Sequence, residues 1–401
     1  MSIVVQKFGG SSVANAERVM NVARRIVETY KQGNSVVVVV SAQGDTTDEL
    51  IEKAIEINPK GSKREMDMLL SSGEQISVAL LAMAIQSLGY NAVSLTGWQA
   101  GFHTDSNYSS AKIKTINSER VKKELDSNNI VIIAGFQGIN KYEDITTLGR
   151  GGSDTSAVAI AAALGADLCE IYTDVDGVYT ADPRIVPNAS KLDDISYDEM
   201  LELASLGANV LHNRSVEMAK KYSVNLVVRS SLNNNEGTVV KEVERVEKMV
   251  VRGVARDNDV ARIALLNVKD EPGVAFKVFS ALAKENINVD IILQSIGREG
   301  KKDISFTVKE NALEDAVELL NKNKDLFLFE ELKYTNEVSK ISIVGAGMVN
   351  NPGVAAKMFE ALSDAHINIH MISTSEIKVS VLVNQKNAEL AVSAIHDKFH
   401  L

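Results

Sequence analysis

Cysteine is almost absent from this chain, because Cys169 is the single one among 401 residues. A disulfide needs two cysteines, and cysteine-rich metal sites need several, so neither kind of cross-link exists within one chain. A chain without disulfides suits a reducing compartment. We therefore expect a cytoplasmic protein.

An excess of positive charge and a long apolar run are also missing. Lys and Arg number 43 against 53 Asp and Glu, which gives a net charge of -10 and disfavours nucleic acid or an anionic membrane as partner. The longest apolar run, "VVVVV" at 36–40, is far too short to span a bilayer. The N-terminus enters a strand-like segment within three residues, with no pattern of a secretory leader. We expect neither nucleic acid nor membrane as a partner.

Histidines are few, and their spacing predicts no metal site. His366 with His370 and His396 with His400 show the i,i+4 spacing of paired ligands, but neither pair has an evident third ligand. We expect surface histidines and no resident metal.

The first 245 residues alternate between strand and helix patterns. The expected strands are short, rich in Val and Ile, and bounded by Gly, Asn or Ser. They are "SIVVQKF", "SVVVVVS", "NAVSL", "IVIIAGF", "CEIYTDV" and "NLVVRS". Helical segments such as "SAVAIAAALGA" lie between several of them. This alternation predicts an α/β fold, with a mostly parallel sheet covered by helices on both faces and ligands at the carboxyl ends of its strands.

A repeat follows a polar exit segment at 233–248. The segment 270–295 matches 350–375 at an offset of 80 residues, with 12 of 26 positions identical. Each copy predicts a strand, a Pro-Gly turn, a helix, two strands and a helix. The second copy lacks a final strand, and an unassigned strand, "MVVRGVA", precedes the first copy. We expect domains at 1–245, at 261–335, and at 249–256 joined to 340–401, because a sheet with a missing edge needs a strand.

The stretch "VVQKFGGSS" at 4–12 places a lysine and two glycines directly after a strand. Glycines let backbone N–H groups approach a ligand closely, a helix N-terminus offers unpaired N–H groups, and Lys7 adds a positive charge. These features predict a phosphate site, although the order of residues is not that of a P-loop. The alternative is a tight turn between a strand and a helix.

A second glycine-rich turn, "LGRGGSDTSA" at 148–157, precedes a helical segment. Arg150 followed by Gly151 and Gly152 predicts a nest for an anion, with Asp154 at its mouth to orient a lysine or meet a metal-bound nucleotide. The alternative is a helix cap by Ser153 or Asp154, which leaves Arg-Gly-Gly without an explanation.

Two further motifs are individually ambiguous. "YTDVDGVYTADPR" at 172–184 is either an acidic turn beside phosphate or a plain hairpin, and it lacks the spacing of a calcium-binding EF-hand loop. "SSGEQIS" at 71–77 places Glu74 after a glycine, where we expect the start of a helix. The alternative for Glu74 is an ordinary carboxylate in a first helical turn.

Taken together, these motifs resemble the aspartate kinases (aspartokinases) of the amino acid kinase family. "KFGGSS", "VVVVSAQGDTTDEL", "SSGEQIS", "LGRGGSDTSA", "YTDVDGVYTADPR", "VLHNRSVEMAKKY" and "VVRSS" occur in the family's order, and the resemblance covers essentially the whole chain. The two repeats resemble ACT domains, which are βαββαβ amino-acid sensors. The implied architecture is an αβα sandwich followed by two ferredoxin-like ACT domains.

The resemblance implies transfer of the γ-phosphoryl of MgATP to the β-carboxylate of L-aspartate, with ATP and its Mg²⁺ as the cofactors. Lys7 and Asp154 are the implied catalytic residues. The implied nucleotide-binding residues are Gly9, Gly10, Ser11, Ser41, Thr173, Asp174, Tyr179, Asp182, Arg184, Asn209 and Val210. The implied aspartate-binding residues are Thr47, Glu74, Arg150, Gly151, Gly152 and Ser153.

The ACT resemblance implies feedback inhibition by an end-product amino acid, lysine first, then threonine or both together. It also implies a homodimer formed through the ACT domains, with pairing of dimers as a further option. The implied effector residues are Asp270, Val274, Ala275, Asn288, Val289, Asp290, Gln294, Val354, Asn368 and Ile369. Either acid would meet the effector ammonium, and the alternative for both is a solvated loop or a helix cap.

One departure from the family stands in "GANVLHNRSVE". Asn209 and Asn213 occupy positions where lysine and proline are common in the family. The open alternatives are a kinase of the same family with another acceptor, namely glutamate, acetylglutamate or a nucleotide, and a sensor that has lost catalysis. The sensor is disfavoured by the retention of Lys7, Glu74, Arg150 and Asp154.

Overall fold

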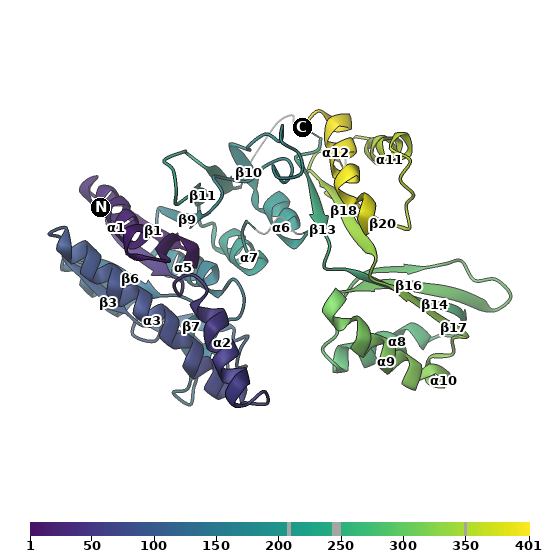
Figure 1. The fold of residues 1–401 in the computed structure, drawn as a ribbon, viewed down its shortest axis with the longest axis horizontal. Helices are drawn as coiled ribbons and strands as arrows, with labels where there is room; N and C mark the ends of the chain where they lie inside the picture. Colours follow the sequence, from purple (N-terminus) through teal and green to yellow (C-terminus); the bar gives the residue numbers. More distant parts are fainter. Residues whose placement is uncertain (207–209, 243–249, 349–350) are drawn as a thin grey trace. The chain divides into compact units, whose positions relative to one another are not determined.

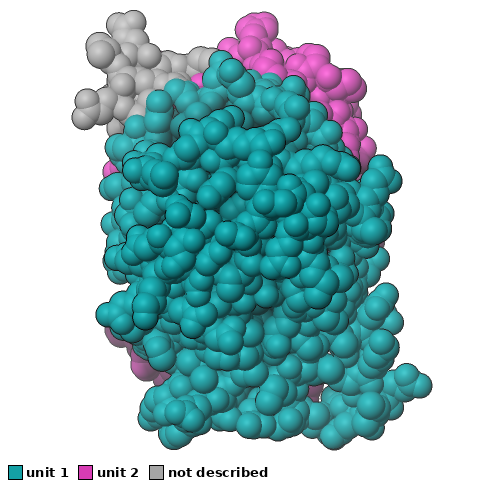
Figure 2. All heavy atoms as spheres, turned by 90° about the vertical axis from the view of Figure 1, so that its left-hand side faces the viewer, with its two compact units in different colours: residues 1–179, 191–205, 209–246 teal, residues 180–190, 206–208, 247–401 magenta. Residues whose placement is uncertain are grey.

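The computed structural model describes residues 1–206, 210–242, 250–348 and 351–401. The chain forms two compact units, residues 1–179, 191–205 and 209–246, and residues 180–190, 206–208 and 247–401 (Figure 2). One internal segment of the expected 1–245 domain, 180–190, therefore groups with the second unit. The expected boundary at 245 lies outside the described residues.

The first unit is built on an eight-stranded sheet in the order β10-β12-β11-β9-β1-β2-β6-β3. The strands are β1 Ile3–Phe8, β2 Ser35–Val40, β3 Ala92–Leu95, β6 Ile130–Ala134, β9 Leu168–Thr173, β10 Asp194–Ser196, β11 Leu226–Ser230 and β12 Thr238–Lys241. Every described neighbouring pair is parallel except β11 with β12. The predicted α/β class with a mostly parallel sheet is confirmed.

Helices cover both faces of this sheet, which explains why β2 and β6 are continuous runs of Val and Ile. The helices are α1 Ala16–Lys31, α2 Thr46–Ile57, α3 Lys63–Ser87, α4 Glu119–Asp126, α5 Gly152–Leu164, α6 Tyr197–Ser205 and α7 Asn213–Tyr222. Phe8 of β1 packs in one core with apolar residues of α1 and α3. Figure 1 shows α1, α3 and α5 around the strands of this sheet. Because side chains alternate along a strand, Lys7 points to the opposite face, where α5 packs against β1.

Helix α3 corrects one prediction, because Glu74 does not lie at a helix start. The helix begins at Lys63, where the Ser62 hydroxyl accepts a hydrogen bond from the Glu65 N–H, and it continues through Glu74 to Ser87. Gly73 does not break the helix. A Cβ there would lie 2.8 Å from the Ala42 Cβ, so this glycine permits close approach of the loop after β2.

By length and composition alone, α3 is also apolar enough to cross a membrane, but half of its most apolar window is buried inside the protein. It packs against β3, β6 and α1, as a core helix does. We therefore interpret its apolar character as packing within the first unit.

A small second sheet in the order β5-β4-β7-β8 lies within the first unit. Its strands are β4 Phe102–Thr104, β5 Ile113–Ile116, β7 Gln137–Ile139 and β8 Ile145–Thr147. Strand β8 packs against α3, and the turn that follows it leads directly into α5. This sheet therefore determines where the Arg150 turn begins.

The second unit contains two four-stranded antiparallel sheets. The first has the order β15-β16-β14-β17, with β14 Ala261–Lys269, β15 Val289–Gln294, β16 Lys301–Val308 and β17 Glu331–Thr335. Its helices are α8 Val274–Lys284, α9 Leu313–Lys322 and α10 Lys324–Phe327. Gly273 precedes α8 with φ of 92°, a left-handed conformation that explains the glycine of the Pro-Gly turn.

The second sheet has the order β13-β18-β20-β19, with β13 Gly253–Asp257, β18 Val338–Val344, β19 Met371–Thr374 and β20 Lys378–Asn384. Its helices are α11 Val354–Asp364 and α12 Ala388–Phe399. Strand β13 precedes the first repeat in sequence yet pairs with β18 of the second. The segment 180–190 belongs here because Ala181 and Val186 pack in this core and the Thr180 carbonyl accepts a 2.7 Å hydrogen bond from the Val254 N–H.

Candidate active site

The ends of four central strands meet at one edge of the large sheet. Phe8 lies opposite Val40 and Tyr172, and Val40 lies opposite Ala134. The segments that follow these strands, Gly9–Ser11, Ser41, Gly135 and Asp174, therefore emerge side by side, as parallel strands require. This edge collects most of the residues predicted for the kinase site.

Lys7 and Asp154 form an ion pair at this edge. The Lys7 Nζ lies 2.6 Å from the Asp154 Oδ1, and the two side chains are 12% and 13% exposed. One group comes from the end of β1 and the other from the first turn of α5. The predicted pairing of these two residues is thus present, with a small exposed fraction left for a ligand.

The two glycines of the turn after β1 differ in how much room surrounds them. A Cβ at Gly10 would lie 2.5 Å from the Ala42 carbonyl oxygen, so packing alone excludes a side chain there. A Cβ at Gly9 would lie 3.5 Å from the Lys7 Nζ, which is ordinary contact. A Cβ at Gly9 would therefore touch the lysine without a clash, so packing alone does not explain this glycine.

The turn before α5 is closely packed rather than capped by a side chain. Gly151 is the N-cap residue at φ of 69°, and a Cβ there would lie 2.2 Å from the Cγ of His212. Ser153 and Asp154 both lie inside the helix, so the capping alternative is not realised. Arg150 is exposed, and among the described residues the structure gives its guanidinium no ion pair or hydrogen bond.

Glu74 provides a buried acceptor beside the same edge. Its Oε1 accepts a 3.1 Å hydrogen bond from the Ala42 N–H, and its Oε2 has no hydrogen-bond partner among the described residues. Burial raises the pKa of the Glu74 carboxyl to about 7. A buried oxygen without a partner is costly, and a bound cation would satisfy it.

The remaining residues predicted to bind aspartate, or to line the boundary between aspartate and ATP, lie in the segments after β2 and β8. The Ser41 N–H donates to the Phe8 carbonyl at 3.1 Å, which fixes the chain just before Ala42. Thr47 lies half-buried in the first turn of α2. Gly152 packs against the ring of Phe136, where a Cβ would lie 2.8 Å from the nearest ring carbon.

The predicted nucleotide residues divide between the two units. In the first, the Thr173 hydroxyl donates to Asp174 at 3.1 Å, and the Tyr179 hydroxyl donates to Asp176 at 2.7 Å, which with burial raises the Tyr179 pKa to about 12. Val210 is half-buried. Asn209 lies outside the described residues.

Asp182 and Arg184 belong to the second unit, where they form an ion pair at 2.7 Å. The guanidinium lowers the pKa of the Asp182 carboxyl. The Arg184 side chain is 88% exposed. Nucleotide binding by these two residues stays a prediction.

Phe136, which the sequence analysis did not single out, lies beside the candidate site. It follows β6 at the same edge with φ of 68°, a left-handed conformation that is unfavourable for a bulky residue. Its N–H donates to the Ser156 hydroxyl and its carbonyl accepts from the Leu148 N–H. The "GF" after a buried strand was the available signal, because strained backbone concentrates at ligand sites.

Both acids predicted to bind an effector are already paired with lysines in the second unit. Asp270 lies 2.7 Å from the Lys302 Nζ, and Asp290 lies 2.6 Å from the Lys340 Nζ. Asp270 lies in the exposed loop after β14, and Asp290 lies on β15. Lys340 is nearly buried and also contacts Asp257 at 3.2 Å.

The other predicted effector residues lie around the same elements. Val274 is buried at the start of α8, and Ala275 beside it is half-buried. Val289 and Gln294 lie on β15, with Asn288 just before it. Val354 begins α11, and Asn368 and Ile369 precede β19.

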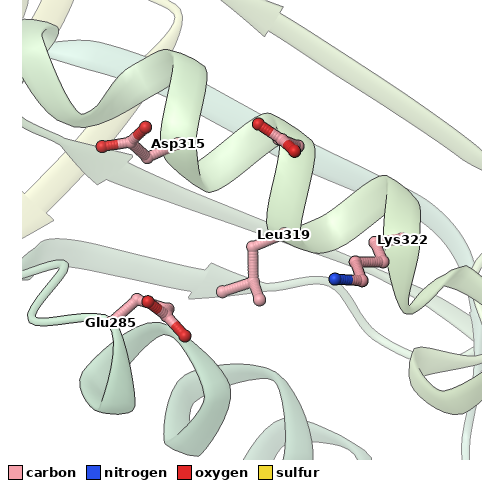
Figure 3. A pocket seen from close by; sticks show the side chains of 5 residues that line it. Glu285, Asp315, Leu319 and Lys322 are labelled. Carbon is pink, nitrogen blue, oxygen red and sulfur yellow. The ribbon is translucent and has the colours of Figure 1, made fainter.

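A hollow of about 370 Å³ lies between α8 and α9, apart from these residues (Figure 3). It is lined by Glu285, Asp315, Glu318, Leu319 and Lys322.

Across the described parts of the chain, no group of three or more His, Cys, Asp or Glu side chains is arranged to hold a metal ion. His396, expected at the surface, is instead buried and lies 3.0 Å from the Thr180 hydroxyl.

Comparison with known proteins decides the family. The model of the amino acid kinase family matches residues 2–230, and that of the ACT domain matches 266–323 and 341–399. The aspartokinase of Bacillus sp. (strain MGA3) is 51% identical over 100% of this chain and 98% of its own, and that of Corynebacterium glutamicum is 53% identical over 100% and 97%. The chain belongs to the aspartokinases. It is accordingly a phosphotransferase with a carboxyl group as acceptor, which confirms the predicted enzyme class.

Solved aspartokinases have the same fold. Aspartokinase III of E. coli in complex with aspartate and ADP (R-state) matches with a TM-score of 0.84 at 25% identity over 100% of both chains. The same enzyme with lysine and aspartate (T-state) matches with a TM-score of 0.78 at 25% identity, over 100% of both chains. The predicted kinase fold followed by ACT domains is therefore confirmed.

Proposed function

We propose that this aspartokinase transfers the γ-phosphoryl group of MgATP to the β-carboxylate of L-aspartate, giving 4-phospho-L-aspartate, the first intermediate toward lysine, threonine and methionine. The observation that carries the proposal is the Lys7–Asp154 pair beside a turn without side chains. The solved relative with bound aspartate and ADP supports both ligands.

On the phosphate side, Lys7 stabilises charge on the transferring group. Its ammonium has three N–H donors and Asp154 takes one, which leaves donors for phosphate oxygens. The N–H groups of Gly9, Gly10 and Ser11 add neutral donors. Phosphoryl transfer depends mainly on positioning and charge stabilisation, which fits a site without a covalent nucleophile.

On the aspartate side, two charges of opposite sign select an α-amino acid. Arg150, exposed and without a partner among the described residues, takes the α-carboxylate through its planar fork. Glu74 takes the α-ammonium through its unpartnered Oε2. Thr47 and Ser153 complete this pocket, and Ser41 lies between it and the nucleotide.

Magnesium enters with the nucleotide. Mg²⁺ usually binds substrate phosphates and only one or two carboxylates. When bound, it neutralises phosphate charge. Asp154 is placed to meet the metal-bound nucleotide while it holds Lys7.

The organisation that we propose has a kinase domain at 1–245 and ACT domains at 261–335 and at 249–256 with 340–401. Lysine is the first choice of effector, followed by threonine or both, and a relative with bound lysine supports this order. The protein acts in the cytoplasm as a homodimer formed through the ACT domains, with pairing of dimers as an option.

The test is formation of an acyl phosphate from MgATP, trapped with hydroxylamine. L-Aspartate and L-glutamate are compared, each with and without lysine and threonine. Hydroxamate from aspartate alone is the expected result, and suppression by lysine, by threonine or only by the pair identifies the effector. Hydroxamate from glutamate alone would overturn the proposed acceptor.

A catalytically inactive sensor is the second candidate, because Asn209 stands where lysine is common in the family. It predicts no hydroxamate from either amino acid in folded protein that still binds lysine. Restoring the charge with Asn209→Lys would then be the first repair to attempt.

A further inference from the structure

The turn that presents Arg150 is held from two sides by the charged side chains of Asp67 and Arg214, to which the sequence analysis assigned no role. It begins at Thr147, the last residue of β8, and runs into α5. Arg150 itself has no ion pair or hydrogen bond with the described residues. Its position therefore depends on how the backbone on either side is fixed, including the backbone at Thr147 and Leu148.

Asp67 of α3 holds the amide side of this backbone. It is fully buried and accepts hydrogen bonds from the Thr147 N–H at 2.9 Å and the Thr147 hydroxyl at 2.8 Å. It also accepts from the Ser109 N–H at 2.9 Å and from the Ser109 hydroxyl at 3.3 Å. A buried carboxylate is tolerated when its oxygens are satisfied in this way.

Arg214 of α7 holds the carbonyl side. Its guanidinium donates to the Leu148 carbonyl at 2.5 Å and to the Ala111 carbonyl at 3.0 Å. The Ala111 N–H in turn donates to the Thr147 carbonyl at 2.9 Å. Two short backbone segments, 109–111 and 147–148, are thus joined to each other, with a carboxylate on their N–H groups and a guanidinium on their carbonyls.

Asp67 and Glu74 lie on the same face of α3, because residues seven apart in a helix are two turns apart. Between them, the Ser71 carbonyl accepts a 2.9 Å hydrogen bond from the buried Gln137 amide, just after Phe136. One rigid helix therefore contacts the loops on both sides of the pocket. Glu74 takes the substrate ammonium directly, whereas Asp67 acts through the turn of Arg150.

We propose that Asp67 and Arg214 are positioning residues that fix the separation between Arg150 and Glu74, and so fit the pocket to the two ends of the substrate amino acid. This inference rests on the proposed function, because it assumes that Arg150 and Glu74 hold an amino-acid substrate. Among the described residues, Lys7 and the glycine turn make no hydrogen bond with Asp67 or Arg214, although Asp154, the partner of Lys7, follows the Arg150 turn.

The test compares Asp67→Asn with the matched control Asp144→Asn. Asp144 lies three residues before Thr147. It pairs with Arg64 of α3 and with Tyr108, but not with the Arg150 turn. In Asp67→Asn we expect the KM for aspartate to rise about 10- to 100-fold, because a misplacement of about 1 Å can reduce efficiency 10²-fold. The KM for ATP stays within about twofold, and the control changes neither value.

Hydrogen exchange supplies a readout that does not need activity. In Asp67→Asn, the amides of the 145–152 segment should exchange faster than in the wild type and in Asp144→Asn. Arg214→Met should raise the KM for aspartate about tenfold in the same direction. If Asp67→Asn does not fold, Thr147→Val removes one of its hydrogen bonds and should raise that KM about two- to fivefold.

Unchanged KM for aspartate and unchanged exchange in folded Asp67→Asn would overturn the proposal, as would an equal rise in the KM values of aspartate and ATP. With Thr147→Val in its place, an unchanged KM for aspartate in both Thr147→Val and Arg214→Met would do the same. A wild-type protein that forms no acyl phosphate from aspartate contradicts the proposed function instead. The exchange comparison then decides only whether Asp67 fixes the Arg150 turn.

Discussion

Each unit of this molecule contains a largely buried lysine that is paired with carboxylate, and the two sites differ in how many partners the lysine has. Lys7 of the kinase unit has Asp154 as its ion-pair partner and lies beside a glycine turn at a sheet edge. Lys340 of the ACT unit is 6% exposed and contacts Asp290 and Asp257 from two other strands. The first arrangement leaves an ammonium with donors to offer to a ligand. The second ties three strands together.

The surroundings of Lys340 keep it charged despite its burial. Burial alone would lower the pKa of Lys340, but the hydrogen bond and charge of Asp290 and the charge of Asp257 outweigh it, so the pKa is raised. The stability that this pair contributes is present below the ordinary lysine pKa and is lost only as the pH rises through the raised value. The two lysines therefore differ in the number of their carboxylate partners and in whether a ligand can reach them.

The largest difference between the two lysines is expected for Lys7→Ala. Loss of one preorganised charge contact to the transferring group should reduce turnover about 10²- to 10³-fold. The rate of hydroxamate formation at saturating aspartate and ATP measures this effect. A turnover close to that of the wild type would remove Lys7 from the mechanism.

Lys340→Met tests the other lysine and should leave turnover without effector within about threefold. It should reduce the free energy of unfolding of the ACT unit by about 2 kcal/mol, because it deletes charged hydrogen bonds while the half-exposed Asp290 can still be solvated. Denaturant unfolding measures the stability. A large loss of turnover in protein that remains folded would contradict the separation of roles.

The third prediction uses the raised pKa of Glu74. The substrate ammonium needs the ionised carboxylate, so kcat/KM for aspartate should rise about tenfold per pH unit below pH 7 and level off above it. Since the folded pKa lies above that of the unfolded chain, ionisation of Glu74 costs stability as the pH rises from about 4.5 to 7. Bound aspartate should offset that cost.

Glu74→Gln is the control for this profile. It should raise the KM for aspartate and remove the pH step near 7, while the KM for ATP is retained. A step that persists in Glu74→Gln would assign the ionisation to another group.

The smallest effect is expected for Asp270→Asn. Its pair with Lys302 is close to half exposed at the carboxylate, and such pairs contribute less than about 1 kcal/mol. Thermal unfolding should therefore change little. Inhibition by lysine or threonine is the informative readout, since a shift in the inhibitory concentration would place Asp270 in the effector site and no shift would leave it a surface pair.

The sequence predicted the sheet well because its strands carry a local signal. Runs such as "VVVVV" and "IVIIA" are buried on both faces, so no other element suits them. Lys7 and Asp154 were paired by their resemblance to known motifs, and the 2.6 Å contact agrees. The catalytic and binding roles assigned to the individual residues remain predictions.

What the sequence did not reveal depends on distant contacts. Gly73 resembles a helix break, but it lies inside α3, and its missing side chain lets Ala42 pack against the helix. Asp67 and Thr147 are far apart in the chain and share no motif, so their contact appears only in the folded unit. The pairing of Asp290 with Lys340 joins the two repeats and was likewise invisible to a comparison of one repeat with the other.

Strand β13 has a consequence for how the chain folds as it is synthesised. It leaves the ribosome before the whole first repeat, yet its partner β18 follows that repeat. Gly253 therefore cannot pair with Val344 until the first repeat has been synthesised. The first repeat holds all four of its own strands and can fold meanwhile. Because distant pairings form slowly, the second ACT sheet should be the last part to close, and ribosome-bound chains that end before β18 should resist protease in the first repeat but not at β13.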